Sequence, residues 1–331
     1  MHRGLVVRRA VAMDVAEWEA IDRQKAAPTF FARPAWAHAV VKTYPRFALA
    51  PVWCEFADGT KVFVPMVKSR GRLGWSEYFG LPLDKYTAAL ESDGRLADPA
   101  RAQAAFAYVL THLGHSCTLT PWPPAYGEIA ISSATGGVRE TSLIDLSDGL
   151  EAALARMDGN ARRMAHQSER RGVICTREPA SSATVDEYYA MLSITASAWD
   201  RGAPTFPKLL LEEVVARGGP DVEIWFARYE DKPIAGGVAV YGDQELMFWS
   251  AAMLSEFSTL RPSNALNVAL IRAAAARGVR WYNLGSSEGC SPGVKRFKEG
   301  LGAFSSAYTR FVRISPIYAM YCDVRNRLVA R

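Results

Sequence analysis

Basic side chains are concentrated in one stretch of the sequence, between residues 160 and 171. Arg163, His166 and Arg170 recur at i, i+3 and i+7, so a helix would place them on one face. Planar guanidinium groups bind phosphate oxygens through paired hydrogen bonds. The stretch is therefore predicted to bind a pyrophosphate or a nucleic-acid backbone, and a solvated helix face is the alternative interpretation.

A second set of polar residues follows Val279 to Leu284, an apolar stretch that is predicted to be a strand. Ligands of open sheets bind outside the strand ends, so the loop that begins at Gly285 is expected to meet a substrate. Ser286 and Glu288 lie in this loop. Glu288 is a candidate for accepting the proton of a reacting amine, directly or through water. A turn that only caps a neighbouring helix is the equal alternative.

Two kinds of chemistry are not indicated. No serine–histidine–aspartate or cysteine–histidine arrangement is recognisable, so a covalent enzyme intermediate is not expected. The 5 cysteines and 5 histidines have no metal-ligand spacing, and no metal site is expected.

Hydrophobic periodicity indicates the elements that must position these residues. Apolar residues at spacings of three and four predict a helix over 150–170, and the run Asp158-Gly159-Asn160 is expected to divide it, with Asn160 capping the second part. Further elements of this half are predicted as strands at 173–177, 223–229, 233–241, 245–253 and 279–284, and as helices at 185–200, 208–217 and 263–277.

The first half of the chain shows the same mixture of elements. Helices are predicted at 13–25 and 99–113, with strands at 48–56 and 61–67 joined by a hairpin turn. A terminal helix is expected over 315–331, with Ile317, Met320 and Tyr321 facing inward. We place a domain boundary near residue 147, which gives an N-terminal domain of 1–146 and a C-terminal domain of 147–331.

Bulk composition is that of a folded protein with two cores. The chain has 331 residues, of which 49% are hydrophobic and 22% charged. No apolar run approaches the ~18 residues that span a bilayer, and no signal peptide is recognisable, so we expect a cytoplasmic protein. The net charge of +5 permits an anionic partner such as a phosphate-bearing cofactor, a tRNA or a membrane surface, and no DNA partner is expected.

One pair of segments resembles a known family. Trp281-Tyr282-Asn283-Leu284-Gly285-Ser286, followed by the run from Gly293 to Gly302, is similar to the FemAB-like branch of the N-acetyltransferase (GNAT) superfamily. The resemblance implies an α/β fold of two tandem GNAT-like domains. Each would have a mixed, mostly antiparallel central sheet flanked by helices.

The resemblance also nominates site residues. Lys298 matches the family's lysine and would supply positive charge to an oxyanion or to the donor's phosphate or ribose. Tyr282 and Phe297 would contact substrate, although the core is the stronger interpretation for Phe297. Leu301 departs from the family pattern, because phenylalanine is usual there.

The segment from Leu260 to Ala265 indicates which acyl donor the protein could bind. Acetyl-CoA enzymes normally carry a glycine-rich turn here, whose backbone amides hold the pyrophosphate at a helix N-terminus. This chain keeps Arg261 but has Pro262, which lacks an amide donor, and Asn264 instead of glycine. The segment weakens the case for CoA, while Arg261 at an electropositive helix end remains a candidate for binding the donor.

The resemblance implies a transferase that moves an aminoacyl group from aminoacyl-tRNA, or another acyl group, onto an amine. The acceptor would be a small molecule or a peptide such as a peptidoglycan precursor of the cell envelope. No tightly bound cofactor is expected, and the donor is a co-substrate. The alternatives are an N-acyltransferase that uses acyl-CoA or acyl carrier protein, and a non-catalytic binding protein of the same fold. Peripheral membrane contact through the terminal helix is a further possibility.

Overall fold

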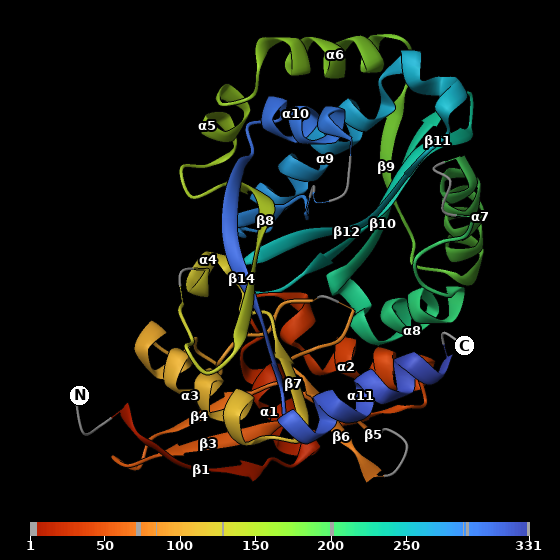
Figure 1. Cartoon of the computed structure of the whole chain (residues 1–331). Coiled ribbons are helices and arrows are strands. Elements are labelled where there is room, and N and C mark those ends of the chain that lie inside the picture. The colour runs from red at the N-terminus through yellow and green to blue at the C-terminus, as the bar shows by residue number, and fades with distance from the viewer. Residues whose placement is uncertain are drawn as a thin grey trace. The chain divides into compact units, whose positions relative to one another are not determined.

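The computed structural model describes residues 5–70, 74–83, 85–127, 129–198, 202–286, 288 and 291–329. The chain divides into two compact units: Met1–Arg139 together with Ala307–Arg331 form the first, and Glu140–Ser306 form the second. The C-terminal segment, which we expected in the second domain, therefore belongs to the first unit. The chain passes between the units twice, within β8 (Thr135–Asp145) and within β14 (Phe304–Ile314) (Figure 1).

The first unit contains two sets of paired strands. One has the strand order β1-β3-β4 and the other β2-β5-β6-β7-β14. The strands are β1 (Val7–Ala12), β2 (Phe47–Leu49), β3 (Val52–Phe56), β4 (Lys61–Val64), β5 (Val67–Arg70), β6 (Ser76–Phe79) and β7 (Ser116–Leu119). The helices are α1 (Val15–Gln24), α2 (Pro34–Thr43), α3 (Pro99–His112), α4 (Pro123–Tyr126) and α11 (Pro316–Val329).

One arginine explains why the C-terminal segment belongs to the first unit. Arg313, on β14, donates from Nε to the Leu110 carbonyl at 2.6 Å and from Nη2 to the Thr111 carbonyl at 2.8 Å. The last carbonyls of a helix have no partner within the helix, and a cation at this end also interacts favourably with the helix dipole. Arg313 therefore caps α3, and β14 itself was not foreseen from the sequence.

The terminal helix α11 packs through only part of the face that we predicted: Tyr321 faces inward as expected, whereas Ile317 and Met320 do not. Tyr318 is buried and donates its hydroxyl hydrogen to Glu77 at 2.7 Å, and Tyr318 and Tyr321 both lie against Trp75. Ile317 and Met320 are 64% and 66% exposed. Their inward placement was wrong, because the aromatic residues occupy the packed face.

The second unit has the strand order β8-β13-β12-β11-β10-β9. Neighbouring strands are antiparallel except β12 and β13, which are parallel. The strands are β9 (Ile174–Glu178), β10 (Val222–Tyr229), β11 (Lys232–Tyr241), β12 (Glu245–Met253) and β13 (Trp281–Asn283). The helices are α5 (Leu150–Ala155), α6 (Gly159–Arg170), α7 (Ser182–Ala198), α8 (Lys208–Gly218), α9 (Pro262–Ala276) and α10 (Pro292–Gly300).

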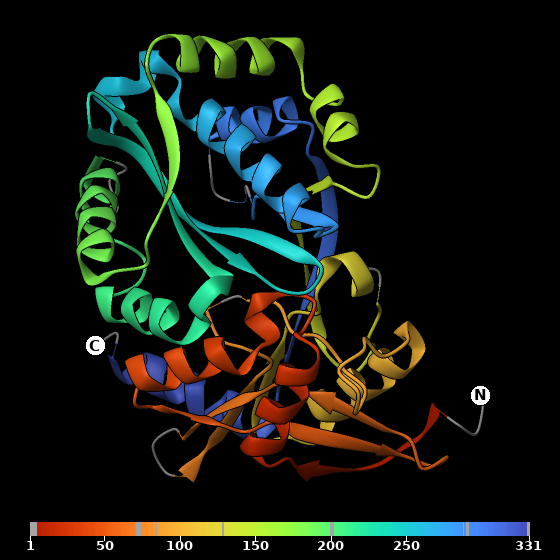
Figure 2. The ribbon, with the colours of Figure 1, turned by 180° about the vertical axis from the view of Figure 1, so that it is seen from behind.

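Helices cover both faces of this sheet. Figures 1 and 2 show α7 and α8 on one face, and α9 with α6 and α10 on the other. The α9 side holds a core of fully buried apolar residues that includes Leu270, Ile271 and Ala274. The predicted break between α5 and α6 is present, but the N-cap of α6 is Asp158 and not Asn160. The Asp158 carboxylate accepts a hydrogen bond from the Asn160 backbone N–H at 2.7 Å, because an N-cap side chain binds the amide two residues later.

No helix in the described part of the chain is both long and apolar enough to cross a bilayer.

Candidate active site

The loop after β13 is fixed on the sheet by its backbone. The Leu284 N–H donates to the Ser142 carbonyl at 2.9 Å, and the Ser142 N–H donates to the Gly285 carbonyl at 3.1 Å. Gly285 has a φ of +73°, a left-handed conformation that glycine adopts without steric cost. Ser286 and Glu288 follow as exposed residues, and the Glu288 N–H donates to Ser286 Oγ at 3.0 Å. The sequence-predicted loop residues thus lie together at the surface.

Helix α10 brings Lys298 to this loop. The helix begins with Pro292 at its first position and ends before Gly302, whose φ is +85°. Lys298 is only 8% exposed, and its Nζ donates to the carbonyls of Gly285 at 2.8 Å and Ser286 at 2.9 Å. The structure therefore places a buried ammonium group directly beside the loop that carries Ser286 and Glu288.

The residues around Lys298 explain the rest of the motif. Leu301, which stands where the family usually has phenylalanine, is fully buried in the core. Phe297 is half-buried and packs against the same core, which agrees with the core interpretation of this residue. Gly302 approaches the backbone of Arg156 so closely that an added Cβ would lie 3.2 Å from it. The motif thus anchors α10, and Lys298 is the member with a polar role.

A buried polar network lies beneath the loop, and the sequence reasoning did not assign it to the site. Asn283 is fully buried; its Oδ1 accepts from Thr141 Oγ1 at 2.8 Å and from the Gly285 N–H at 2.8 Å. Its Nδ2 donates to Glu245 Oε1 at 2.7 Å, and Glu245 is also fully buried. An asparagine inside the apolar strand 281–284 and a glutamate that opens the strand at 245–253 were the available signals.

Tyr282 lies in the core and not at the surface. Its side chain is fully buried, and its hydroxyl donates to Asn267 Oδ1 at 2.7 Å. Asn267 Nδ2 in turn donates to the Ser263 carbonyl at 2.8 Å in the first turn of α9. Burial, with a smaller contribution from Tyr241, raises the pKa of Tyr282 well above its usual value. Substrate contact by Tyr282 stays a prediction, and in this structure the residue links β13 to α9.

The N-terminus of α9 has few free amide donors. Arg261, its N-cap, has a φ of +57° and donates its N–H to the Ser258 carbonyl at 3.1 Å. Pro262 has no N–H, and the Asn264 N–H donates to the Arg261 carbonyl at 3.1 Å. A pyrophosphate held at a helix end needs several converging amides. These residues therefore do not fit the amide cradle that a CoA pyrophosphate requires, although the Arg261 side chain is exposed.

The arginines of α6 are exposed and only partly approach this helix end. Arg171, just after α6, donates from Nη1 to the Thr259 carbonyl at 2.9 Å, which joins the end of α6 to the turn before α9. Arg170 and Arg261 therefore lie at ends of neighbouring segments. Arg163 is at the other end of α6, where its Nη2 donates to Asn160 Oδ1 at 2.7 Å. The structure does not gather Arg163, Arg170 and Lys298 into one cluster of contacting side chains.

A bulge in β12 is a further feature that the sequence did not reveal. The register between β11 and β12 shifts so that Val238 pairs with Ser250 and Ala239 with Phe248, which leaves Trp249 as the extra residue. The Trp249 ring stacks on Phe206, with centroids 4.7 Å apart and planes 21° apart. Bulges commonly redirect a side chain beside a binding site, so Trp249 is an additional candidate contact.

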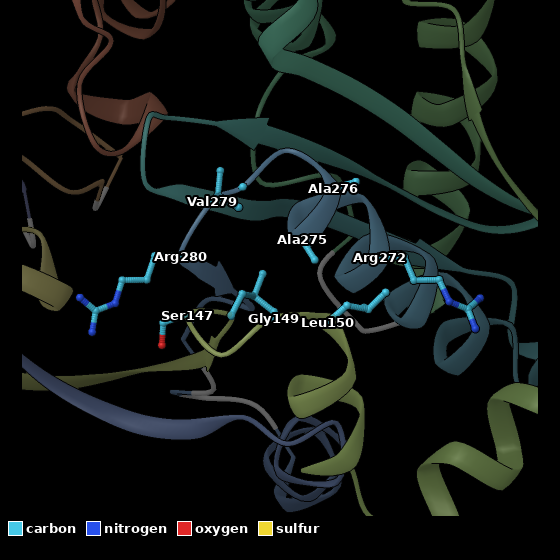
Figure 3. A pocket seen from close by; sticks show the side chains of 10 residues that line it. Ser147, Gly149, Leu150, Arg272, Ala275, Ala276, Val279 and Arg280 are labelled. Atoms are coloured by element: carbon cyan, nitrogen blue, oxygen red, sulfur yellow. The ribbon is translucent and has the colours of Figure 1, made fainter.

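A cavity of about 550 Å³ lies at the opposite end of α9. Its walls come from the end of β8, the start of α5 and the end of α9 (Figure 3). Arg272 and Arg280 stand at its two sides, and Figure 3 shows their guanidinium groups directed away from the cavity and from each other. None of the sequence-predicted site residues lines it. Within the described residues, no group of three or more His, Cys, Asp or Glu side chains is placed to hold a metal ion.

Comparison with known proteins defines the class of this second unit. Residues 155–299 match the family described as the acetyltransferase (GNAT) domain. This stretch contains the bulged strand β12, helix α9, the loop after β13 and Lys298. The chain thus contains a GNAT-type domain in this stretch.

Solved structures extend the similarity to nearly the whole chain. FemX is 12% identical, with a TM-score of 0.68 over 94% of this chain and 99% of FemX. L-PGS from Bacillus licheniformis is 12% identical, with a TM-score of 0.52 over 91% and 92% of the two chains. The C-terminal DUF2156 domain of a lysylphosphatidylglycerol synthetase candidate from Agrobacterium fabrum is 13% identical, with a TM-score of 0.56 over 93% and 94%. None of the curated protein sequences matches significantly. At these identities the likeness concerns the fold, and it confirms the predicted FemAB-like tandem GNAT architecture.

Proposed function

We propose that this protein is a transferase that moves an aminoacyl group from aminoacyl-tRNA onto an amine acceptor without a covalent enzyme intermediate. The observation that carries the proposal is the position of Lys298. A buried ammonium group lies against the loop that presents Ser286 and Glu288 to solvent. The known fold of FemX, which resembles this chain over nearly its full length, supports the same class of reaction.

The proposed reaction needs few parts. The acceptor amine attacks the ester carbonyl carbon, a C–N bond forms, and the C–O bond to the tRNA ribose then breaks. Lys298 stabilises the negative charge that develops on the carbonyl oxygen, because a cation already held in place needs no reorganisation during the reaction. Glu288 accepts the proton lost by the amine, directly or through water, and returns it to the ribose oxygen as the C–O bond breaks.

The remaining predicted residues have binding roles in this proposal. Arg163, Arg170 and Arg261 contact donor phosphates, because exposed guanidinium groups suit them. Ser286 contacts the reacting groups, and Phe297 and Tyr282 support the substrate from the core side. The acceptor is a small molecule or a peptide such as a peptidoglycan precursor, and the reaction takes place in the cytoplasm. Peripheral membrane contact would involve the exposed Ile317, Met320 and Val324 of α11.

Two other functions have support from particular observations. The match of residues 155–299 to an acetyltransferase domain favours an N-acyltransferase that uses acyl-CoA or acyl carrier protein. Against CoA stands the N-terminus of α9, where Pro262 and the internally bonded amides of Arg261 and Asn264 leave no cradle for pyrophosphate. The two carbonyl contacts of Lys298 would also suit a structural lysine in a binding protein without catalytic activity.

One experiment separates these functions. The purified protein is incubated with a panel of charged tRNAs, acyl-CoAs and acylated carrier protein against a panel of amines, and products are identified by mass. We expect transfer from at least one aminoacyl-tRNA, with binding that weakens steeply as salt rises, because phosphate contacts release counterions. Transfer from acyl-CoA alone would establish the first alternative. The absence of any product, together with salt-insensitive binding of tRNA, would overturn the proposal.

A further inference from the structure

The buried pair Glu245 and Asn283 lies directly beneath the loop that holds Lys298. We propose that Asn283 and Glu245 are positioning residues, which fix the Gly285–Ser286 backbone so that its carbonyls hold the Lys298 ammonium in one place. The proposal rests on the proposed function only in one respect: it takes Lys298 as the cation that stabilises the oxyanion. The geometry itself can be tested without any transfer reaction.

The first step in the argument concerns the orientation of the Asn283 side chain. The NH2 group of Asn283 donates to Glu245 Oε1 at 2.7 Å, because an amide nitrogen donates and a carboxyl oxygen accepts. The Asn283 oxygen must then face the opposite way, toward Thr141 and the Gly285 N–H. Thr141 is itself buried, so its hydroxyl is confined to this arrangement. Glu245 thereby selects one of the two orientations of the amide.

The second step concerns the peptide group of Gly285. Its N–H is held by Asn283 Oδ1 at 2.8 Å, and its carbonyl accepts from the Ser142 N–H and from Lys298 Nζ. Gly285 has a φ of +73°. Its N–H is thus bonded to Asn283, which belongs to β13, and its carbonyl to Ser142, which belongs to β8. The carbonyl of Ser286, the second acceptor for Lys298, belongs to the next residue of the same loop.

The third step links the turn to the charge. Lys298 is only 8% exposed, so its ammonium group depends on protein oxygens to replace part of its hydration. A change in the Gly285 backbone would displace the Gly285 carbonyl, one of the two acceptors of Lys298, and would disturb the adjoining Ser286 carbonyl. Asn283 therefore acts on the position of the charge through the Gly285 backbone.

The chain provides a matched control for Asn283 and a reference lysine for Lys298. Asn267 is a second buried asparagine whose side chain makes two hydrogen bonds, to Tyr282 and to the Ser263 carbonyl, in the core of the same unit. Neither of these hydrogen bonds goes to a described residue of the loop after β13. Lys295 lies on α10 with Lys298, and its side chain is 50% exposed. Asn267→Ala thus reproduces the loss of a buried carboxamide, and Lys295 serves as an internal reference lysine.

The experiment is acylation of the folded protein with a low dose of acetic anhydride, with modification at Lys298 and Lys295 measured by peptide mass spectrometry. In the wild type we expect Lys298 to be modified much more slowly than Lys295. In Asn283→Ala the Lys298:Lys295 ratio should rise about fivefold, the factor by which loss of one net hydrogen bond changes a local opening equilibrium. Glu245→Gln, which keeps an acceptor but adds a competing donor, should give a smaller rise, and Asn267→Ala should leave the ratio unchanged.

Two results would overturn the inference. One is an unchanged ratio in both Asn283→Ala and Glu245→Gln; the other is an equal rise in Asn267→Ala, which would indicate general loosening of the core. Should Asn283→Ala not fold, Thr141→Val and Glu245→Gln decide the matter by the same ratio. Where a transfer assay exists, Glu245→Gln should lower kcat with little change in KM. A changed ratio without transfer from any donor would instead contradict the proposed function while the positioning role stands.

Discussion

In the second unit, the N-terminus of α9 and the loop between β13 and α10 differ in how their backbone polar groups are hydrogen-bonded. At the N-terminus of α9, the amides of Arg261 and Asn264 bond to carbonyls of the same turn, and Pro262 contributes none. In the loop between β13 and α10, the backbone is instead held by the side chains of Asn283 and Lys298. The first end is satisfied by backbone carbonyls of its own turn, while the second depends on side chains, one of which comes from the following helix.

This difference indicates where chemistry can be located. A helix end at which two amides are already bonded and one residue is proline offers fewer donors to a ligand, beside its dipole and the exposed Arg261 side chain. A loop that is preorganised by buried groups can hold a charge in a fixed position without reorganisation during a reaction. In the second unit, the β13–α10 loop is therefore the better organised of the two places, and it is where we propose the site.

The largest expected effect comes from removing the charge at the organised site. Lys298→Ala should lower the rate of transfer by about 10²–10³-fold, the range measured when one oxyanion donor is removed from an enzyme. The comparison variant is Lys295→Ala, an exposed lysine three positions earlier on α10, which should stay within about twofold because exposed ion pairs contribute little. Product formation followed by mass against time gives both rates. Equal rates for the two variants would show that the charge of Lys298 is not used.

The second effect concerns stability at the α9 side, through Tyr282. Tyr282→Phe leaves the buried Asn267 oxygen without its donor and should lower the free energy of unfolding by about 1–3 kcal/mol near pH 8. Because the folded-state pKa of Tyr282 is raised above 10.0, its contribution is complete below pH 10 and is lost as pH rises further, when the unfolded chain ionises first. Denaturant unfolding at pH 8 and pH 11 should therefore show a smaller difference between variant and wild type at the higher pH. A difference that widens with pH would contradict this.

A third test compares two glycines in left-handed conformations. Gly285 has a φ of +73° and Gly278, just after α9, has a φ of +71°. An alanine at either position should cost about 1–2 kcal/mol of unfolding free energy, the usual penalty for a side chain in this region. An added Cβ at Gly285 would also lie 3.3 Å from Met247, whereas none of the described atoms approaches it within 4 Å at Gly278. Only Gly285→Ala should then reduce transfer and raise acylation of Lys298, and an equal functional loss in Gly278→Ala would remove the distinction.

The smallest effect is expected from restoring a backbone amide donor at the N-terminus of α9. The double variant Arg261→Gly, Pro262→Gly restores an amide donor and removes a side chain from a left-handed position. With CoA near its dissociation constant, mass action should raise its melting temperature by about 1–2 °C. The wild type should show no shift at the same CoA concentration in a thermal-melt assay. A clear shift in the wild type would show that CoA binds without an amide cradle, and the two ends would no longer differ in this way.

The sequence was informative where a local pattern determines the structure. The order of strands and helices from 150 to 284, the break near Asp158 and the glycine stop at 278 all follow from periodicity and capping. The proximity of Lys298 to Ser286 followed from the family motif. The role of Asn283 did not, because its partners Thr141 and Glu245 come from strands far apart in the chain.

Other features that the sequence did not predict also depend on contacts between residues far apart in the chain. Strand β14 is recognised only through its pairing and through Arg313, which binds carbonyls about 200 residues earlier in the sequence. The packed face of α11 is set by contact of Tyr318 with Trp75, and helical periodicity alone favoured Ile317 and Met320. The bulge at Trp249 depends on the register of β11 with β12, which no local sequence pattern specified.

The capping of α3 by Arg313 has a consequence for the order of events during synthesis. The second unit is one continuous segment, Glu140–Ser306, whereas the first is built from two segments that flank it in the sequence. The first unit needs residues of 307–331, and until Arg313 is synthesised the carbonyls at the end of α3 lack its guanidinium group. Domains usually fold from the N-terminus onward during translation. Here the N-terminal segment cannot complete its unit until the whole of the second unit has been synthesised.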